Sequence, residues 1–146
     1  MTHHVDLLPG QQLFSNPQPG QENLLFTPTK AFMLIMQPDG NLVYYAINDG
    51  RLDGTWSNIG DPSIYTEVVW SANSNTWTSW DNRCIMQSDG NLVVYSGGTD
   101  HFPQWSSGTY GHPDEGAFLR PQDDGNLVIY LGNTPIWQSG TKAGGG

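Results

Sequence analysis

The stretch Gln37-Pro38-Asp39-Gly40-Asn41-Leu42-Val43-Tyr44-Tyr45 decides the fold, because it occurs three times in a chain of 146 residues. The second copy is QSDGNLVVY at 87–95, and the third is QDDGNLVIY at 122–130. Seven of the nine positions are identical in all three copies. An internal repeat of this kind indicates an architecture built from similar units. The sequence therefore predicts three equivalent structural units.

Each copy has the sequence features of a β-hairpin. An Asp-Gly pair between apolar runs indicates a tight turn, and a three-residue loop closed by a glycine is a common hairpin connection. In the first copy the loop would be 38–40, where proline fixes the first φ and Gly40 accepts a positive φ. The flanking strands are then expected at 31–37 and 41–47.

The alternation of side chains along a strand divides each hairpin into two faces. One face of the first copy would carry Gln37, Asn41, Val43 and Tyr45, with Asp39 at the turn within reach. The apolar face would carry Leu34, Met36, Leu42 and Tyr44. Turn and strand propensities explain the Asp-Gly-Asn and the leucine. They do not explain why Gln, Val and Tyr recur on one face while their neighbours vary, so we interpret this face as a binding face.

The chemistry of this face suits a sugar. Amides, a carboxylate and a phenol supply donors and acceptors around a small apolar spot, which matches hydroxyls that alternate with C–H surface. The pattern Gln-x-Asp-x-Asn-x-Val-x-Tyr resembles the signature of the bulb-type (monocot-like) mannose-binding lectins, the B-lectin domain family. The resemblance extends from about Leu7 to Thr141 and includes all three copies of the signature without a substitution.

The resemblance implies a fold, a ligand and a role for each motif residue. The fold would be all-β, a β-prism II of three four-stranded antiparallel sheets about a pseudo-threefold axis. In that family Asp and Asn bind the axial 2-hydroxyl of mannose, Gln the 3-hydroxyl and Tyr the 4-hydroxyl, while Val packs on the C3–C4 face. The carbohydrate-binding residues implied here are Gln37, Asp39, Asn41, Val43, Tyr45, Gln87, Asp89, Asn91, Val93, Tyr95, Gln122, Asp124, Asn126, Val128 and Tyr130.

The implied function is that of a non-enzymatic, metal-independent lectin that binds terminal α-mannose on glycans and gains strength from multivalent avidity. The alternative is a protein-interaction module of toxin or bacteriocin type, which keeps the repeat fold without using all sugar sites. Family members often exchange the C-terminal strand, here 133–141, to form a homodimer, and the resemblance extends that expectation to this chain.

Composition and charge exclude several other classes. Fourteen acidic and five basic residues give a net charge of −9, which repels nucleic-acid phosphates and anionic lipids. No run reaches transmembrane length, and the N-terminus has no features of a secretory signal. We therefore expect no nucleic acid, no membrane insertion, and a cytoplasmic location or export by a signal-independent route. Low charge with 18 Gly and 10 Pro suits one compact all-β domain at 1–141, followed by a disordered tail at 142–146.

Catalytic and metal chemistry have little support in the sequence. A glycosidase needs two carboxylates that flank the bond, and only the third copy adds a second one, Asp123, which is adjacent in the turn. His3, His4, His101 and His112 have no Ser or Cys partner at an interpretable spacing. Calcium would need about six to eight oxygen ligands, more than one carboxylate per motif supplies. No catalytic residue, metal or cofactor is expected.

A second periodic signal follows each hairpin. The segments are Trp70-Ser71-Ala72-Asn73-Ser74, WSSGT at 105–109 and WQSGT at 137–141. Three indoles at equivalent places in a threefold repeat would meet near the axis as a shared core. The alternative is that each indole stacks on a sugar. We favour the core, because one face of each sheet must bury something large.

The remaining features lie between and before the repeats. The first two copies are about 15 residues farther apart than the last two, which predicts an insertion within 48–67. We favour a surface loop pinned by Trp56 over an extra glycan subsite, and Trp77 and Trp80 carry the same ambiguity. Two N-terminal strands at 12–15 and 23–27 are expected to complete the sheet begun by the first hairpin. The single cysteine, Cys84, is expected to be a buried, inert thiol beside Val94.

Overall fold

The computed structural model describes residues 6–47, 65–75, 81–97 and 102–141, and these contain eleven strands and no helix. The strands are β1 (Gln12–Phe14), β2 (Leu24–Phe26), β3 (Phe32–Met36), β4 (Leu42–Ile47), β5 (Tyr65–Ser71), β6 (Arg83–Met86), β7 (Leu92–Ser96), β8 (Phe102–Ser106), β9 (Phe118–Pro121), β10 (Leu127–Leu131) and β11 (Thr134–Gln138). In these ranges nothing forms a helix that could span a membrane.

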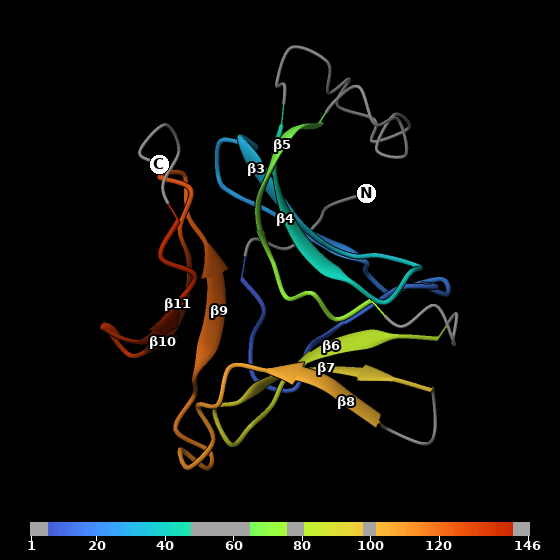
Figure 1. Cartoon of the computed structure of the whole chain (residues 1–146). Coiled ribbons are helices and arrows are strands. Elements are labelled where there is room, and N and C mark those ends of the chain that lie inside the picture. The colour runs from blue at the N-terminus through green and yellow to red at the C-terminus, as the bar shows by residue number, and fades with distance from the viewer. Residues whose placement is uncertain (1–5, 48–64, 76–80, 98–101, 142–146) are drawn as a thin grey trace.

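Three antiparallel sheets stand around a common axis (Figure 1). The first sheet has the order β2-β3-β4-β5, the second β1-β6-β7-β8 and the third β9-β10-β11. The predicted all-β fold of three sheets is confirmed, with three strands in the third sheet instead of four. Leu7 occupies the missing place through an isolated bridge to Leu119, with N···O distances of 2.9 and 3.0 Å. This bridge does not extend because a turn begins at Leu8, where Gln11 N donates to Leu8 O, and directs the chain into the second sheet.

The three motif hairpins have the loop that the sequence predicts. In the first copy Gln37 N donates to Asn41 O over 3.1 Å, and Gly40 N donates to Gln37 O over 2.9 Å. The same two bonds recur in the other copies, at 2.9 and 3.1 Å in the second and at 2.9 and 3.0 Å in the third. Gly40 has a φ of 88°, in the left-handed region that glycine adopts without strain. The loop at 38–40 and its equivalents are therefore confirmed.

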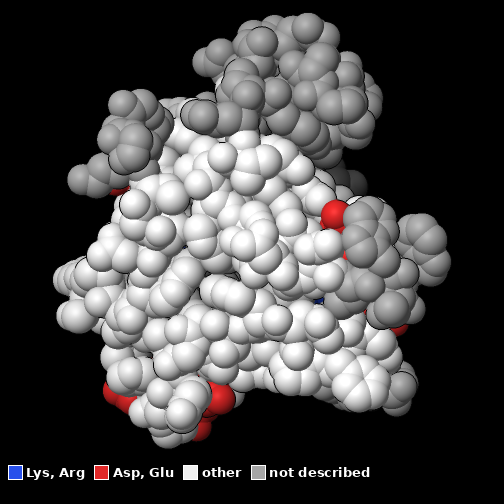
Figure 2. All heavy atoms as spheres, in the orientation of Figure 1, with Lys and Arg blue, Asp and Glu red and all other residues white. Residues whose placement is uncertain are grey.

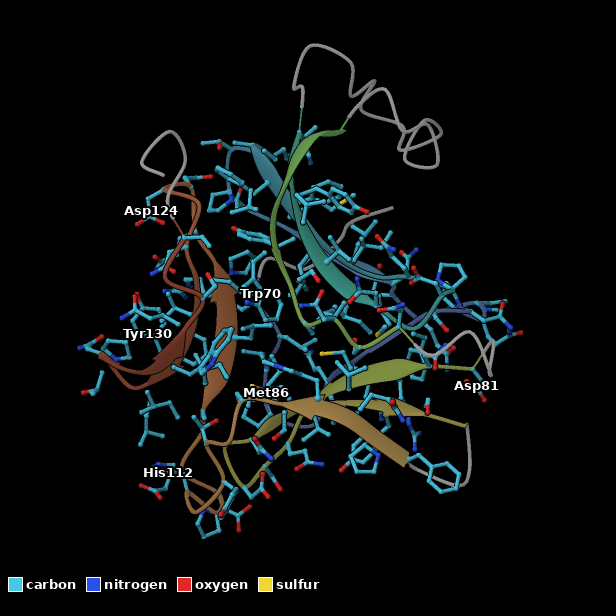
Figure 3. All side chains as sticks on the ribbon, in the orientation of Figure 1. Trp70, Asp81, Met86, His112, Asp124 and Tyr130 are labelled. Carbon is cyan, nitrogen blue, oxygen red and sulfur yellow. The ribbon has the colours of Figure 1, made fainter. Side chains whose placement is uncertain are left out.

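The inward faces of the sheets meet in one hydrophobic core. Its fully buried members include the four residues predicted for the apolar face of the first hairpin, Leu34, Met36, Leu42 and Tyr44. Trp70, Trp105 and Trp137 form an edge-to-face triangle with ring centroids 5.3, 5.5 and 5.6 Å apart. Figure 3 shows Trp70 close to the axis between the sheets. The core interpretation of these tryptophans is thereby confirmed, because the rings contact one another.

The N-terminal strands differ from the prediction in one respect. β2 pairs with β3 as expected, but the assignment of β1 to the first sheet is wrong, because β1 pairs with β6 of the second sheet. Reciprocal hydrogen bonds fix this pairing at its end: Ser15 N donates to Asn82 O and Asn82 N donates to Ser15 Oγ, both over 2.9 Å. The chain therefore visits the third, second and first sheets in turn before it forms the hairpins.

Several further expectations can be compared with the structure. Cys84 is fully buried opposite Val94, as predicted, and burial raises the pKa of its thiol. β5 begins at Tyr65, so the last three residues of the range given for the insertion belong to a strand. Residues 48–64, Trp56, Trp77, Trp80 and the tail at 142–146 lie outside the described residues. β11 pairs with β10 of its own chain, and the homodimer through strand exchange stays a prediction.

Candidate functional site

Each motif brings its polar side chains together at the turn end of its hairpin, and we number the three sites 1 to 3 in chain order. The glutamine and the tyrosine of each motif are already joined. Tyr45 Oη donates to Gln37 Oε1 in site 1. Gln87 Nε2 donates to Tyr95 Oη over 2.6 Å in site 2, and Gln122 Nε2 donates to Tyr130 Oη in site 3. The pairs are half-buried, so each presents one fixed combination of donor and acceptor.

The aspartate of each motif holds the turn through one carboxylate oxygen, Oδ1. Its Oδ1 accepts a hydrogen bond from the backbone N–H of the motif asparagine, over 2.9, 3.0 and 2.9 Å in sites 1 to 3. This is the Asx turn that aspartate favours two residues before its partner. In site 1 Gln37 Nε2 also lies 3.3 and 3.4 Å from the two oxygens of Asp39. The carboxylate is thus oriented by the turn and faces the Gln–Tyr pair.

The motif asparagine is held by a segment that sequence reasoning did not assign to the site. This latch segment, as we call it, follows the tryptophan strand of the same sheet and comprises 72–74 in site 1, 107–109 in site 2 and 139–141 in site 3. In site 2 Gly108 N and Thr109 N donate to Asn91 Oδ1 over 3.0 and 3.2 Å. In site 3 Gly140 N and Thr141 N do the same to Asn126 Oδ1 over 3.0 and 3.3 Å. In site 1 Ser74 N donates to Asn41 Oδ1 over 3.0 Å.

These bonds determine which end of the asparagine amide faces outward. Because the carbonyl oxygen is occupied by latch donors, the Nδ2 group is left as the donor on the polar face of the hairpin. In site 3 Asn126 Nδ2 lies 2.8 Å from Gln138 Oε1, and in site 1 Asn41 Nδ2 lies 3.4 Å from Ser71 Oγ. Sites 1 and 2 thus combine an amide donor with a carboxylate acceptor, whereas Asn126 of site 3 is only 7% exposed and its amide already donates to Gln138.

The latch segment also supports the hairpin turn itself. Thr109 Oγ1 donates to Gly90 O over 2.6 Å, Thr141 Oγ1 to Gly125 O over 2.7 Å, and Ser74 Oγ to Gly40 O over 2.9 Å. The middle latch residue has a positive φ in every copy, which Gly or Asn adopts most readily. The repeated small residue, Gly or Asn, and hydroxyl after each tryptophan were therefore the sequence signal for this support.

The motif valines contribute less surface than the resemblance implies. Val43 and Val93 are each 3% exposed and Val128 is 2% exposed. Their contact with a ligand would be limited to a small apolar floor between the polar groups. The role of these valines in packing on a sugar stays a prediction.

The turns of the three hairpins rest on different neighbours, and only the third turn uses the side chain of its second residue. Pro38 O accepts from Asn82 Nδ2 at 3.5 Å, and Ser88 O accepts from Asp114 N at 2.8 Å. In site 3 Asp123 Oδ1 accepts from Thr29 Oγ1 and Thr29 N at 2.6 and 3.1 Å. The Thr29 hydroxyl is the main cause that lowers the pKa of Asp123. Asp123 therefore joins two sheets and is not a second carboxylate across a cleft.

The donor sets of the sites suit hydroxyl groups better than cations. Each site offers one carboxylate that already accepts a backbone hydrogen bond, with amides and a phenol around it. Among the described residues, no group of three or more His, Cys, Asp or Glu side chains could hold a metal ion. The burial of Tyr45 and the charge of Asp39 raise the pKa of this phenol, so that it keeps its proton at neutral pH. Of the histidines considered in the sequence, His112 lies in a surface loop, with its Nδ1 3.3 Å from Glu115 Oε2.

Comparisons with known proteins find the fold of this chain in solved structures. No model of a known family matches the chain, and no curated protein matches its sequence. Solved structures match over most of its length. Monomeric monocot mannose-binding lectins from Gastrodia elata share 29% identity with a TM-score of 0.67, over 94% of this chain and 98% of theirs.

Two further neighbours were solved with sugars bound. The mannose-specific agglutinin from snowdrop (Galanthus nivalis) bulbs, in complex with methyl-α-D-mannoside, shares 29% identity over 93% of this chain and 95% of its own, with a TM-score of 0.61. The Polygonatum cyrtonema lectin, in complex with a monomannoside, shares 26% identity over 93% of this chain and 96% of its own, also with a TM-score of 0.61.

The chain and its structural neighbours share one fold class, the β-prism II of three antiparallel sheets. More narrowly, the chain has the B-lectin fold of the monocot bulb-type mannose-binding lectins, and the resemblance predicted from the three motifs is confirmed. Lectins are non-enzymatic carbohydrate-binding proteins, which supports the expectation that this chain is not an enzyme.

Proposed function

We propose that the protein is a lectin that binds terminal α-linked mannose directly, without a metal ion, at sites 1 to 3. The observation that carries this proposal is the recurrence of the same residues at all three hairpin tips: an asparagine held by its latch segment, a carboxylate held by its turn, and a joined Gln–Tyr pair. Groups that are already held in place lose little conformational freedom when a ligand binds.

The arrangement suits mannose because its polar groups can be divided between the 2-hydroxyl and the 3- and 4-hydroxyls of one ring. The motif carboxylate accepts and the asparagine Nδ2 donates, as at Asp89 and Asn91 of site 2, so the two together can hold one hydroxyl that both gives and takes. An axial 2-hydroxyl projects toward this pair, whereas the equatorial one of glucose or galactose points along the ring. The Gln37–Tyr45 pair, which lies beside Asp39, then binds the 3- and 4-hydroxyls. The mannoside-bound snowdrop and Polygonatum lectins support this class of ligand.

Charge supports a neutral ligand. The chain carries a net charge of −9, and each site contains a carboxylate. The face shown in Figure 2 is mostly uncharged, with acidic groups at its margins and almost no Lys or Arg. An anionic sugar would be repelled from such sites, while the hydroxyls of a neutral sugar would be accepted.

Affinity at one site is expected to be weak. A shallow site with four or five hydrogen bonds should bind a monosaccharide with a Kd of about 1 mM, near −4 kcal/mol. Three sites that engage one glycan surface can raise the effective affinity by about 100- to 10,000-fold. The protein would therefore distinguish dense mannose-rich surfaces from free sugar.

The test replaces the three motif aspartates with asparagine (D39N/D89N/D124N). Asparagine keeps the Oδ1 acceptor of the turn but exchanges the free carboxylate oxygen for a donor, so the ligand loses a charged hydrogen bond. Such bonds contribute about 1.5–3 kcal/mol, which predicts affinity for methyl α-mannoside at least about tenfold weaker by NMR or calorimetric titration. Asp123→Asn is the matched control, since it changes the neighbouring carboxylate of the same turn and should leave sugar binding unchanged.

Substitution of the motif asparagines would be a poorer test, because their carbonyl oxygens hold the latch segments. Methyl α-galactoside serves as the ligand control, since its 2-hydroxyl is equatorial and its 4-hydroxyl axial. Binding of methyl α-mannoside by the triple variant with unchanged affinity would refute the assignment of the sites. A folded wild-type protein that binds no mannoside would instead leave the protein-interaction module as the better interpretation.

A further inference from the structure

Site 2 is bordered by a loop tied closely to its turn. This loop, 109–116, which we call the site-2 loop, begins in the latch segment and crosses the hairpin tip. His112 N donates to Asp89 O over 2.9 Å, and Asp114 N donates to Ser88 O over 2.8 Å. The packing is tight enough that a Cβ placed on Gly90 would lie 2.8 Å from Thr109 O and 3.0 Å from His112 Cβ. Figure 3 shows His112 in this loop, beside the second sheet.

Tyr110 occupies the stretch between the two ends of this attachment. Thr109 is bound to Asn91 and Gly90, and His112 is bound to Asp89, so the backbone of Tyr110 is fixed within reach of the Asp89–Asn91 edge. Its side chain is 71% exposed, the largest value among the exposed large hydrophobic side chains of the described residues. A tyrosine has an apolar ring face and few rotatable bonds, which suits it to stack on the C–H face of a sugar.

The proposed orientation of mannose places the rest of a glycan on this side. The inference rests on that proposed function, in which Asp89 and Asn91 hold the 2-hydroxyl. C1 is the ring neighbour of C2, so a sugar linked through C1 leaves the site past the same edge. The Gln87–Tyr95 pair would hold the 3- and 4-hydroxyls and would contact only the terminal residue.

We propose that Tyr110 forms a second subsite of site 2, which stacks on the sugar residue to which the terminal mannose is α-linked. With this subsite, site 2 binds disaccharides more tightly than single mannose residues. Stacking of this kind should strengthen binding of a suitable mannobiose about tenfold over the monosaccharide.

Among the described residues, an aromatic ring directly after the latch segment occurs in the second copy and not in the first. The residue after the latch segment is Asn75 in site 1, an exposed polar side chain that offers no ring. In the third copy this position is Lys142, which lies outside the described residues. The site-2 loop also exposes the acidic side chains Asp114 and Glu115, and acidic groups lie over this region at the lower left of Figure 2. The second sugar is therefore expected to be neutral.

The experiment isolates site 2 in the variant D39N/D124N and compares it with D39N/D124N/Y110A. Each protein is titrated with methyl α-mannoside and with α1,2-, α1,3- and α1,6-linked mannobiose. With Tyr110 present, at least one mannobiose should bind about tenfold more tightly than the monosaccharide. Y110A should bring that ratio close to one while the affinity for methyl α-mannoside stays the same, and Y110F should keep the ratio. A site-1 protein, D89N/D124N, should show no such preference.

The outcomes separate this inference from the function on which it rests. If methyl α-mannoside binds but no mannobiose ratio changes on Y110A, the second subsite is refuted and the lectin assignment stands. If methyl α-mannoside does not bind to the folded site-2 protein, both fail. Thermal unfolding of each variant confirms that it is folded, which the exposure of Tyr110 leads us to expect.

Discussion

The first and second hairpins carry the same motif, yet different latch segments hold them. In site 2 two hydroxyls share the support: Ser107 Oγ accepts from Leu92 N over 3.0 Å, and Thr109 Oγ1 donates to the glycine carbonyl of the turn. In site 1 Ser74 alone makes both bonds, accepting from Leu42 N over 3.2 Å. The comparison shows that the motif forms the same turn in both copies, whereas the hydroxyl groups that support this turn differ.

The tryptophan triangle is the part in which the copies do not differ, and it provides the largest expected effect. Replacement of Trp105 by Ala should lower the free energy of unfolding by about 3 kcal/mol, the lower end of the range for large aromatic residues, because the ring is half-buried. Since each ring contacts the other two, Trp70→Ala and Trp137→Ala should cost similar amounts. Urea unfolding followed by circular dichroism measures all three.

The corresponding Trp→Phe variants are the controls, because they keep a smaller ring at the axis and should lose less. A copy whose tryptophan could be removed at almost no cost would show that the triangle is not a shared core. In that case the copies would differ in their tryptophan packing at the axis, and not only in their latch segments.

The motif asparagines should show the difference between the copies directly. Asn91 Oδ1 accepts from Gly108 N, Thr109 N and Ser107 Oγ, so Asn91→Ala leaves several donors without a partner. We expect a loss of about 2 kcal/mol in the free energy of unfolding. Asn41 Oδ1 accepts from Ser74 N, and Asn41→Ala should cost about 1 kcal/mol. Urea unfolding of the two variants measures the difference.

Asn126→Ala is the internal control, since Asn126 Oδ1 receives the same three kinds of donor as Asn91 and should cost about as much. Equal losses at Asn41 and Asn91 would contradict the view that the first latch is the weaker one. They would indicate that the turn, and not the latch, holds the asparagine in both copies.

Much of the fold and of the candidate site could be predicted from the sequence, because the repeated motif has a clear turn signal and a clear strand pattern. The Asp-Gly pair fixes the three-residue loop, and the period of two along each strand separates Leu42 from Val43. Three tryptophans at equivalent places must meet near an axis if the hairpins are related by a threefold rotation. Each of these rules is local and applies to all three copies, so agreement among the copies supports each prediction.

The rest depends on contacts between distant segments, for which the sequence gives no register. The pairing of β1 with β6 is fixed by Ser15 and Asn82, which are 67 positions apart. The latch segments were visible as a pattern, but their role depends on the return of the chain to the asparagine after the third strand of each sheet. Proximity of this kind follows from the closed arrangement of the sheets and not from any single motif.

Tyr44 marks a difference between the copies in the core, where the equivalent residues are Val94 and Ile129. It is fully buried, and its Oη donates to Gln122 O over 3.2 Å, which links the first hairpin to the turn of site 3. Tyr44→Phe keeps the ring and its stacking on Phe32 at 5.6 Å. We therefore expect only the loss of one hydrogen bond, about 1 kcal/mol in the free energy of unfolding at pH 8, measured by urea unfolding.

The pH dependence of that difference tests the burial of the phenol. Burial raises the pKa of Tyr44 above its usual value of 10.0, so the folded protein holds this proton more tightly than the unfolded chain. The stabilisation is complete below pH 10 and is lost as the pH rises further, by about 1.4 kcal/mol for each pH unit. Because all other groups titrate in both proteins, the advantage of the wild type over Tyr44→Phe should disappear near pH 11. A difference that stayed constant between pH 8 and pH 11 would mean that the pKa of Tyr44 is the same in the folded protein as in water. The phenol at the contact between the first hairpin and the turn of site 3 would then be accessible to solvent.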